Sequence, residues 1–108
     1  MTADDFRKLA LRMPEATESA HMGHPDFRVR NRIFATLSRS DEDLGMVQLT
    51  PEQQREFVGQ RPEIFVPVKG GWGVKGATHV RLAKADAESA GAALTAAWRN
   101  VSAKSKAK

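Results

Sequence analysis

The chain has 108 residues, a formal net charge of +4 and no cysteine. This length predicts one domain, since domains most often hold roughly 100–150 residues. The lack of cysteine excludes disulfides and thiolate catalysis, and it favours a reducing, cytoplasmic setting. No run of about 18 apolar residues is present, so we expect no segment that crosses a membrane.

The positive charge is concentrated at the C-terminal end. Lys104, Lys106 and Lys108 lie in a short polar run. Without these three lysines, 14 of the 17 basic residues remain against 13 acidic ones, which gives a net charge of +1. We therefore predict a nearly neutral domain over residues 1–101 and a basic, disordered tail over residues 102–108.

Three segments carry helix signals. Thr2 and a carboxylate three residues later form a start like a capping box for a helix over residues 2–13. A threonine–proline pair starts a second helix over residues 51–60. Residues 86–101 carry the longest apolar stripe at helical spacing, which predicts a third helix across the sheet with Trp98 in the core.

Strand signals fill the segments between these helices. Alternating apolar residues predict a hairpin over residues 27–30 and 33–37, and further strands over residues 44–49 and 78–82. Residues 63–68 have prolines near both ends, which favours an edge strand or a fixed loop. The predicted fold class is α+β, an antiparallel sheet of four to six strands with three helices on one face.

Enzyme signatures are missing from the sequence. No nucleophile elbow surrounds the serine residues. The glycine-rich segment over residues 70–76 leads into a predicted strand, which is the wrong context for a P-loop or a Rossmann turn. We therefore predict a binding module without catalytic residues and without a cofactor.

Two histidines lie in a polar stretch, residues 15–26, that we interpret as irregular. His21 and His24 could form a metal pair, because imidazole is a common ligand. Carboxylates and His79 do not lie at a recognised ligand spacing from them, so no metal site is expected. His24 is instead interpreted as fixing the entry to the hairpin through hydrogen bonds.

Three arginines lie around the predicted hairpin turn. Arg28 and Arg30 project from one face of the first strand, and Arg32 lies across the turn. Guanidinium groups bind phosphate with a planar fork of donors, so this spacing favours phosphate contact. The alternative is a solvated face paired with Asp26 or with the acidic turn over residues 41–43.

Trp72 is surrounded by glycines, with Lys69 and Lys75 on either side. A tryptophan beside cations can serve nucleic-acid binding, since a stacked base contributes ~1–3 kcal/mol. Large aromatic residues more often anchor a core, so we predict that the Trp72 ring packs against the sheet. An exposed ring would favour the stacking interpretation.

Several segments together resemble the MmcQ/YjbR family of small bacterial proteins. The likeness runs from about residue 3 to about residue 101. It rests on Asp5-Phe6-Arg7, His24-Pro25-Asp26-Phe27-Arg28-Val29, Ile33-Phe34-Ala35-Thr36-Leu37, Leu49-Thr50-Pro51-Glu52-Gln53-Gln54, Gly70-Gly71-Trp72-Gly73, Gly76-Ala77-Thr78, Val80-Arg81-Leu82 and Ala97-Trp98-Arg99. The resemblance implies an α+β fold related to frataxin-like domains and a DNA-binding role through a double-wing motif.

The main hypothesis is a monomeric, non-enzymatic DNA-binding module. The residues predicted to contact nucleic acid are Arg28, Arg30, Arg32, Trp72, Lys75 and Arg81. One alternative is a small-molecule or metal-binding domain of the frataxin-like kind, with a pocket near His24, Trp72 and His79. Another is a protein–protein adaptor that uses an exposed sheet face or edge. A continuous basic face from the hairpin to the glycine-rich segment would favour DNA.

Overall fold

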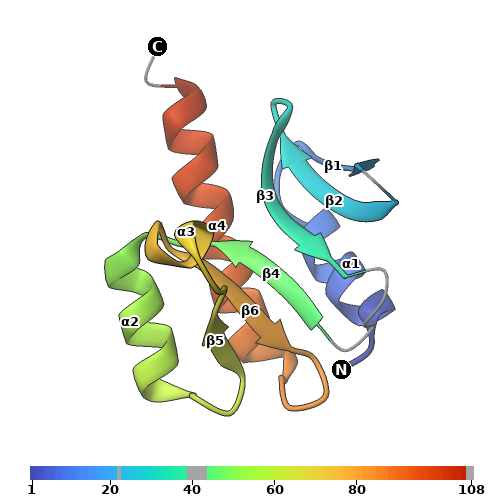
Figure 1. Cartoon of the computed structure of the whole chain (residues 1–108). Helices are drawn as coiled ribbons and strands as arrows, with labels where there is room; N and C mark the ends of the chain where they lie inside the picture. The colour runs from blue at the N-terminus through green and yellow to red at the C-terminus, as the bar shows by residue number, and fades with distance from the viewer. Residues whose placement is uncertain (22, 39–43, 107–108) are drawn as a thin grey trace.

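The computed structural model describes residues 1–21, 23–38 and 44–106 (Figure 1). Within them the elements in chain order are α1 (Ala3–Leu11), β1 (Ala16–His21), β2 (His24–Val29), β3 (Arg32–Leu37), β4 (Leu44–Gln48), α2 (Pro51–Gln60), β5 (Phe65–Pro67), α3 (Gly71–Val74), β6 (Ala77–Arg81) and α4 (Ala87–Lys106). The fold is α+β, as the sequence predicted, with a short fourth helix, α3, in the glycine-rich segment.

The six strands form one sheet in the order β1-β2-β3-β4-β6-β5, and each neighbouring pair is antiparallel. Figure 1 shows α1 and α4 together on one side of the sheet, behind it in this view, while α2 packs against β5 and β6. As far as the described residues go, no helix crosses the centre of the opposite face. That face is therefore available for a site.

The core lies between the sheet and the two helices behind it. Alternate strand residues face it, because successive side chains of a strand point to opposite sides. Phe27 and Val29 are buried there, whereas Arg28 between them belongs to the open face. A register shift in the pairing of β2 with β3 lets the consecutive residues Phe34 and Ala35 both be buried.

Strand β1 was not predicted, since residues 16–21 lie in the stretch interpreted as irregular. They pair with β2 from Ala16↔Val29 to His21↔His24. The strand is first in the sheet order and most of its described side chains are exposed, so it has no apolar alternation that sequence reasoning could detect. Backbone pairing with β2 holds it in place.

Helix α4 continues beyond the predicted domain boundary. Val101 and Ser102 are both buried, and the helix extends to Lys106, so the boundary drawn after Val101 falls inside it. Residues 107 and 108 lie outside the described residues. Although α4 has 20 residues, no helix in the described part of the chain is long and apolar enough to span a membrane.

Trp98 is only partly buried, so its predicted place inside the core needs correction. The ring packs against the edge of the core, and its Nε1 donates a hydrogen bond to the Pro14 carbonyl oxygen at 2.9 Å. This bond ties α4 to the turn that follows α1, which explains why the indole lies at the margin, where its polar atom finds a partner.

Three helix starts carry side-chain caps. Thr2 and Thr50 each form a reciprocal capping box with the residue three positions later. Asp86 Oδ1 accepts a hydrogen bond from the Ser89 backbone nitrogen at 2.7 Å, ahead of α4. That bond is the main cause of a lowered Asp86 pKa. The carboxylate form of Asp86 is therefore favoured in the folded protein.

The Asp86 cap predicts an acid sensitivity of stability. A carboxyl whose pKa is lower in the folded state contributes stability above its unfolded pKa and loses it as pH falls through the folded value. We expect Asp86→Asn, which keeps an acceptor but does not titrate, to reduce the loss of stability below about pH 4. Urea unfolding at pH 7 and at pH 3 measures this, and equal pH dependence in both proteins would contradict it.

Candidate nucleic-acid interface

A groove of about 950 Å³ opens on the uncovered face of the sheet. It runs from the β2–β3 hairpin across β4 and β6 to α3, and residues at the start of α2 and in the C-terminal half of α4 also line it. Ile33, Met46 and Val68 give it apolar walls, while Arg32, Lys75 and other polar side chains lie around them. The groove thus combines apolar surface with positive charge.

Arg28 is held in the groove wall by a buried carboxylate. Its Nε lies 2.8 Å from Asp26 Oδ1 and its Nη2 lies 3.1 Å from Asp26 Oδ2, and the Asp26 side chain has no exposed surface. This bidentate hydrogen bonding raises the pKa of Arg28. The salt bridge uses two of the five guanidinium N–H donors, so it fixes the group without exhausting it.

Arg32 and Lys75 also line the groove, whereas Arg30 and Arg81 do not. Arg30 lies in the turn between β2 and β3 with a φ of 54°, and its Nε is 3.3 Å from Glu15 Oε1. Arg81 is exposed at the end of β6. Of the five predicted cationic residues, the fold therefore brings three together: Arg28, Arg32 and Lys75.

Trp72 lies on the groove rim with 69% of its surface exposed, so the prediction that it packs against the sheet is wrong. The residue of this segment that packs inward is Gly73. A Cβ built on Gly73 would overlap the Val68 carbonyl oxygen and lie 2.7 Å from the Val68 carbonyl carbon. Because the backbone of α3 comes this close to Val68 at Gly73, the side chain of the preceding residue points away from it.

Hydrogen bonds from Gln54 of α2 hold the α3 segment in place. Gln54 Nε2 lies 3.0 Å from the Gly73 carbonyl oxygen and 2.9 Å from that of Ala77. Gly76 has a φ of 114°, and a Cβ there would overlap the Leu49 carbonyl oxygen. These contacts hold Trp72 and Lys75 in a defined place beside the groove.

His79 lies on β6, the strand between β4 and β5, and lines the groove. In the sheet it pairs with Met46 of β4 and with Val66 of β5. Its Nδ1 is buried and has no hydrogen-bond partner among the described residues. Sequence reasoning did not place His79 with the cations, although its alternation with the buried Thr78 and Val80 puts it on the open face. The His79 side chain therefore adds an imidazole to the lining of the groove, with its Nδ1 covered.

The predicted alternative pocket is divided in two by the structure. His79 lines the groove with Trp72, whereas His24 joins His79 in a separate cavity of about 170 Å³. No cluster of three potential metal ligands exists among the described residues. The side chain of His21 and the whole acidic turn over residues 41–43 lie outside them.

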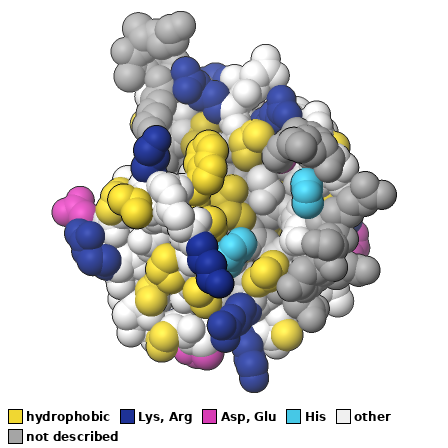
Figure 2. Space-filling model, in the orientation of Figure 1, with side chains coloured by type: hydrophobic (Ala, Val, Ile, Leu, Met, Phe, Trp, Pro, Cys, Tyr) yellow, Lys and Arg dark blue, Asp and Glu magenta, His cyan; other side chains and the backbone are white. Residues whose placement is uncertain are grey.

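The charged residues that line the groove in the described part of the chain are cations, and one of them, Arg28, is paired with the buried Asp26 carboxylate. Arg28, Arg32 and Lys75 line the groove, and no Asp or Glu does so within the described part of the chain. Figure 2 shows this face, with hydrophobic side chains and a histidine near the centre, Lys and Arg around them, and Asp and Glu only towards the margins. The groove therefore suits a ligand with negative charge and an apolar surface.

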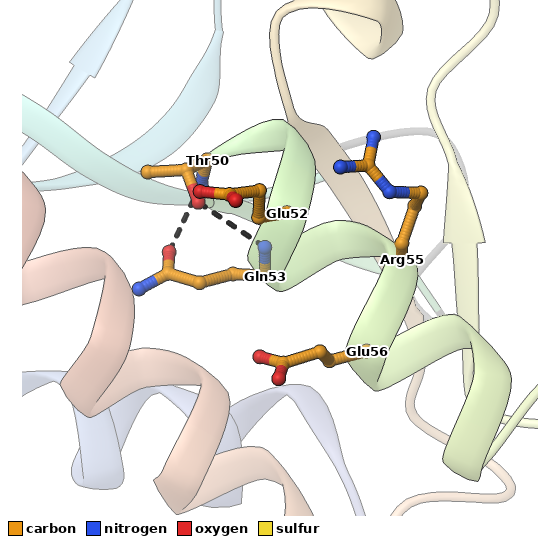
Figure 3. Close-up of a pocket in the computed structure, with 5 residues that line it drawn as sticks. All are labelled: Thr50, Glu52, Gln53, Arg55 and Glu56. Carbon is orange, nitrogen blue, oxygen red and sulfur yellow. Dashed lines mark hydrogen bonds between the residues drawn. The ribbon is translucent and has the colours of Figure 1, made fainter.

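Another hollow, of about 710 Å³, lies beside the first turns of α2 (Figure 3). Its lining comes from one helix and its cap, and the polar atoms of Thr50 and Gln53 already bond to each other's backbone. Glu52 and Glu56 outnumber Arg55 there. This hollow offers no convergent set of binding groups.

Comparison with known proteins identifies the fold and family. The chain is similar to the crystal structure of Deinococcus radiodurans protein DR2400, described as a DUF419 domain, with a TM-score of 0.79 and 21% identity over 96% of this chain and 80% of that one. No curated protein matches the sequence. A family model described as YjbR matches residues 11–100, which is most of the chain. The chain therefore belongs to the YjbR family.

Proposed function

We propose that this protein is a non-enzymatic DNA-binding module that binds as a monomer through the groove on its open sheet face. The observation that carries the proposal is the convergence of Arg28, Arg32, Lys75 and an exposed Trp72 on one groove without an acidic lining residue in the described chain. Cations bind the phosphate backbone, and an aromatic ring binds base faces. The DNA-binding role implied by the family resemblance agrees with this chemistry.

The proposal predicts a particular salt dependence. Each phosphate contact contributes about −0.7 to the slope of log affinity against log salt on single strands and about −0.9 on duplex. The double variant Arg32→Ala/Lys75→Ala should therefore lower the magnitude of the slope by about 1.4 or about 1.8 units. Fluorescence anisotropy of a labelled oligonucleotide at several salt concentrations measures it. Arg28 is left intact because its removal would leave the buried Asp26 carboxylate without its salt bridge.

A matched control removes two positive charges elsewhere. Lys8 on α1 and Lys84 after β6 are exposed and do not line the groove, so Lys8→Ala/Lys84→Ala gives the same change of net charge. We expect the control to change the slope far less than the groove variant. Equal slopes for the two variants, or an affinity for DNA that does not depend on salt, would overturn the proposal.

A second candidate function is the binding of a small anionic aromatic molecule. It is favoured by the groove volume of about 950 Å³, which falls within the range of roughly 300–1,000 Å³ typical of small-molecule sites. His79 lines the same groove between its apolar walls and its cations. Competition by a mononucleotide distinguishes this candidate from DNA binding.

A further inference from the structure

We infer that the groove takes a single strand of DNA, with an unpaired base stacked on Trp72 and neighbouring phosphates at Arg32 and Lys75. The inference rests on the proposed function and specifies its ligand. Three observations carry it: the width of the sheet, the exposed ring of Trp72, and the rigid segment that presents this ring.

The sheet is too wide for the groove of a duplex. Six strands give five steps of about 4.8 Å, a span of about 24 Å, whereas the major groove of B-DNA is about 12 Å wide. A two-stranded ribbon such as the β2–β3 hairpin is narrow enough to enter. However, Arg30 in its turn lies against Glu15, and the groove cations Arg32 and Lys75 lie on opposite sides of β4. A ligand that touches both must lie across the open face.

The exposed Trp72 ring has a use on a single strand that it lacks on a duplex. Bases in a duplex are stacked on each other, so their faces are hidden, while a single strand offers every base face. Trp72 has 69% of its surface in solvent, although burial of an aromatic ring would stabilise the fold. The apolar side chains of Ile33, Met46 and Val68 continue this surface into the groove.

The ring is also presented by a fixed backbone. Gly73 packs against Val68, Gly76 packs against Leu49, and Gln54 bonds to the carbonyl oxygen of Gly73. A side chain on a rigid element loses less conformational entropy when it binds than one on a mobile loop. A base that stacks on Trp72 should therefore bind more favourably than one that stacks on an equally exposed ring in a mobile loop.

The test follows Trp72 fluorescence and affinity together. Trp98→Phe gives a background in which Trp72 is the single tryptophan. Titration with a 12-nucleotide oligothymidylate should quench its emission, and the oligothymidylate should bind at least tenfold more tightly than a 12-base-pair duplex at the same salt concentration. Trp72→Ala should weaken oligothymidylate binding by about 5- to 150-fold, the equivalent of ~1–3 kcal/mol per stacked base.

The matched control is Val74→Ala, which truncates another exposed apolar side chain of α3, 77% exposed, that does not line the groove. It should leave affinity unchanged, and urea unfolding should show that both variants remain folded. Duplex bound as tightly as the single strand, with no effect of Trp72→Ala, would overturn this inference and leave the proposed function standing.

Three further outcomes would count against the inference. Binding to neither form of DNA would overturn the proposed function as well. Thymidine monophosphate bound as tightly as the oligomer would assign the groove to a small molecule. Oligouridylate bound at least tenfold more tightly than oligothymidylate would overturn the choice of DNA.

Discussion

Replacing Gly73 with alanine is expected to destabilise the protein and to disrupt the groove. The new Cβ would overlap the Val68 carbonyl oxygen, which belongs to the backbone and cannot move aside as a flexible side chain can. Overpacking of this kind usually costs about 1–3 kcal/mol, and a clash with backbone places this variant at or above the upper end. Because α3 must shift, Trp72 and Lys75 should also lose their places beside the groove.

The control for this variant is Gly71→Ala in the same helix. A Cβ on Gly71 would meet nothing within 4 Å. Its effect on the free energy of unfolding should stay within about 0.5 kcal/mol, as for other surface changes. Urea unfolding and oligonucleotide affinity measure both variants. If Gly73→Ala matched Gly71→Ala in both measurements, the close packing of α3 on Val68 would be refuted.

Phe6→Ala should produce the largest loss of stability without touching the groove. Phe6 is fully buried between α1 and the sheet, its ring lies edge-on to Phe27 with centroids 6.3 Å apart, and it fills the space above Gly45. Truncation of a buried phenylalanine typically costs ~3–5 kcal/mol. Leu11→Ala, on the same helix but 40% exposed, should cost much less. Chemical denaturation that shows equal losses for the two variants would contradict this account of the core.

The sequence predicted best what local chemistry determines. The capping boxes at Thr2 and Thr50 are formed by residues three positions apart, so the starts of α1 and α2 could be identified from the sequence alone. Strand β1 depends instead on backbone pairing with β2 and has no apolar pattern of its own. The end of α4 was missed because burial of Ser102, a polar residue, comes from tertiary packing.

In the candidate site, too, the sequence predicted what local spacing determines and missed what depends on tertiary packing. Spacing by two correctly put Arg28 on the face opposite Phe27 and Val29, and its pairing with Asp26 was foreseen as the alternative use. Spacing could not show that Arg30 adopts a left-handed turn conformation, which takes it out of the strand alternation and towards Glu15. The exposure of Trp72 depends on which residue of its segment packs inward, and spacing could not show that this residue is Gly73, where a Cβ would overlap the Val68 carbonyl oxygen.

The most direct test compares groove charge with C-terminal charge. The affinity of the protein for a 12-nucleotide single strand would be measured against salt for the parent, for Arg32→Ala/Lys75→Ala and for Lys104→Ala/Lys106→Ala/Lys108→Ala. We predict that the groove variant loses about 1.4 units of slope and most of its affinity, while the C-terminal variant still binds through the groove. Loss of binding in the C-terminal variant alone, with the groove variant unchanged, would contradict the assignment of DNA binding to the open face of the sheet.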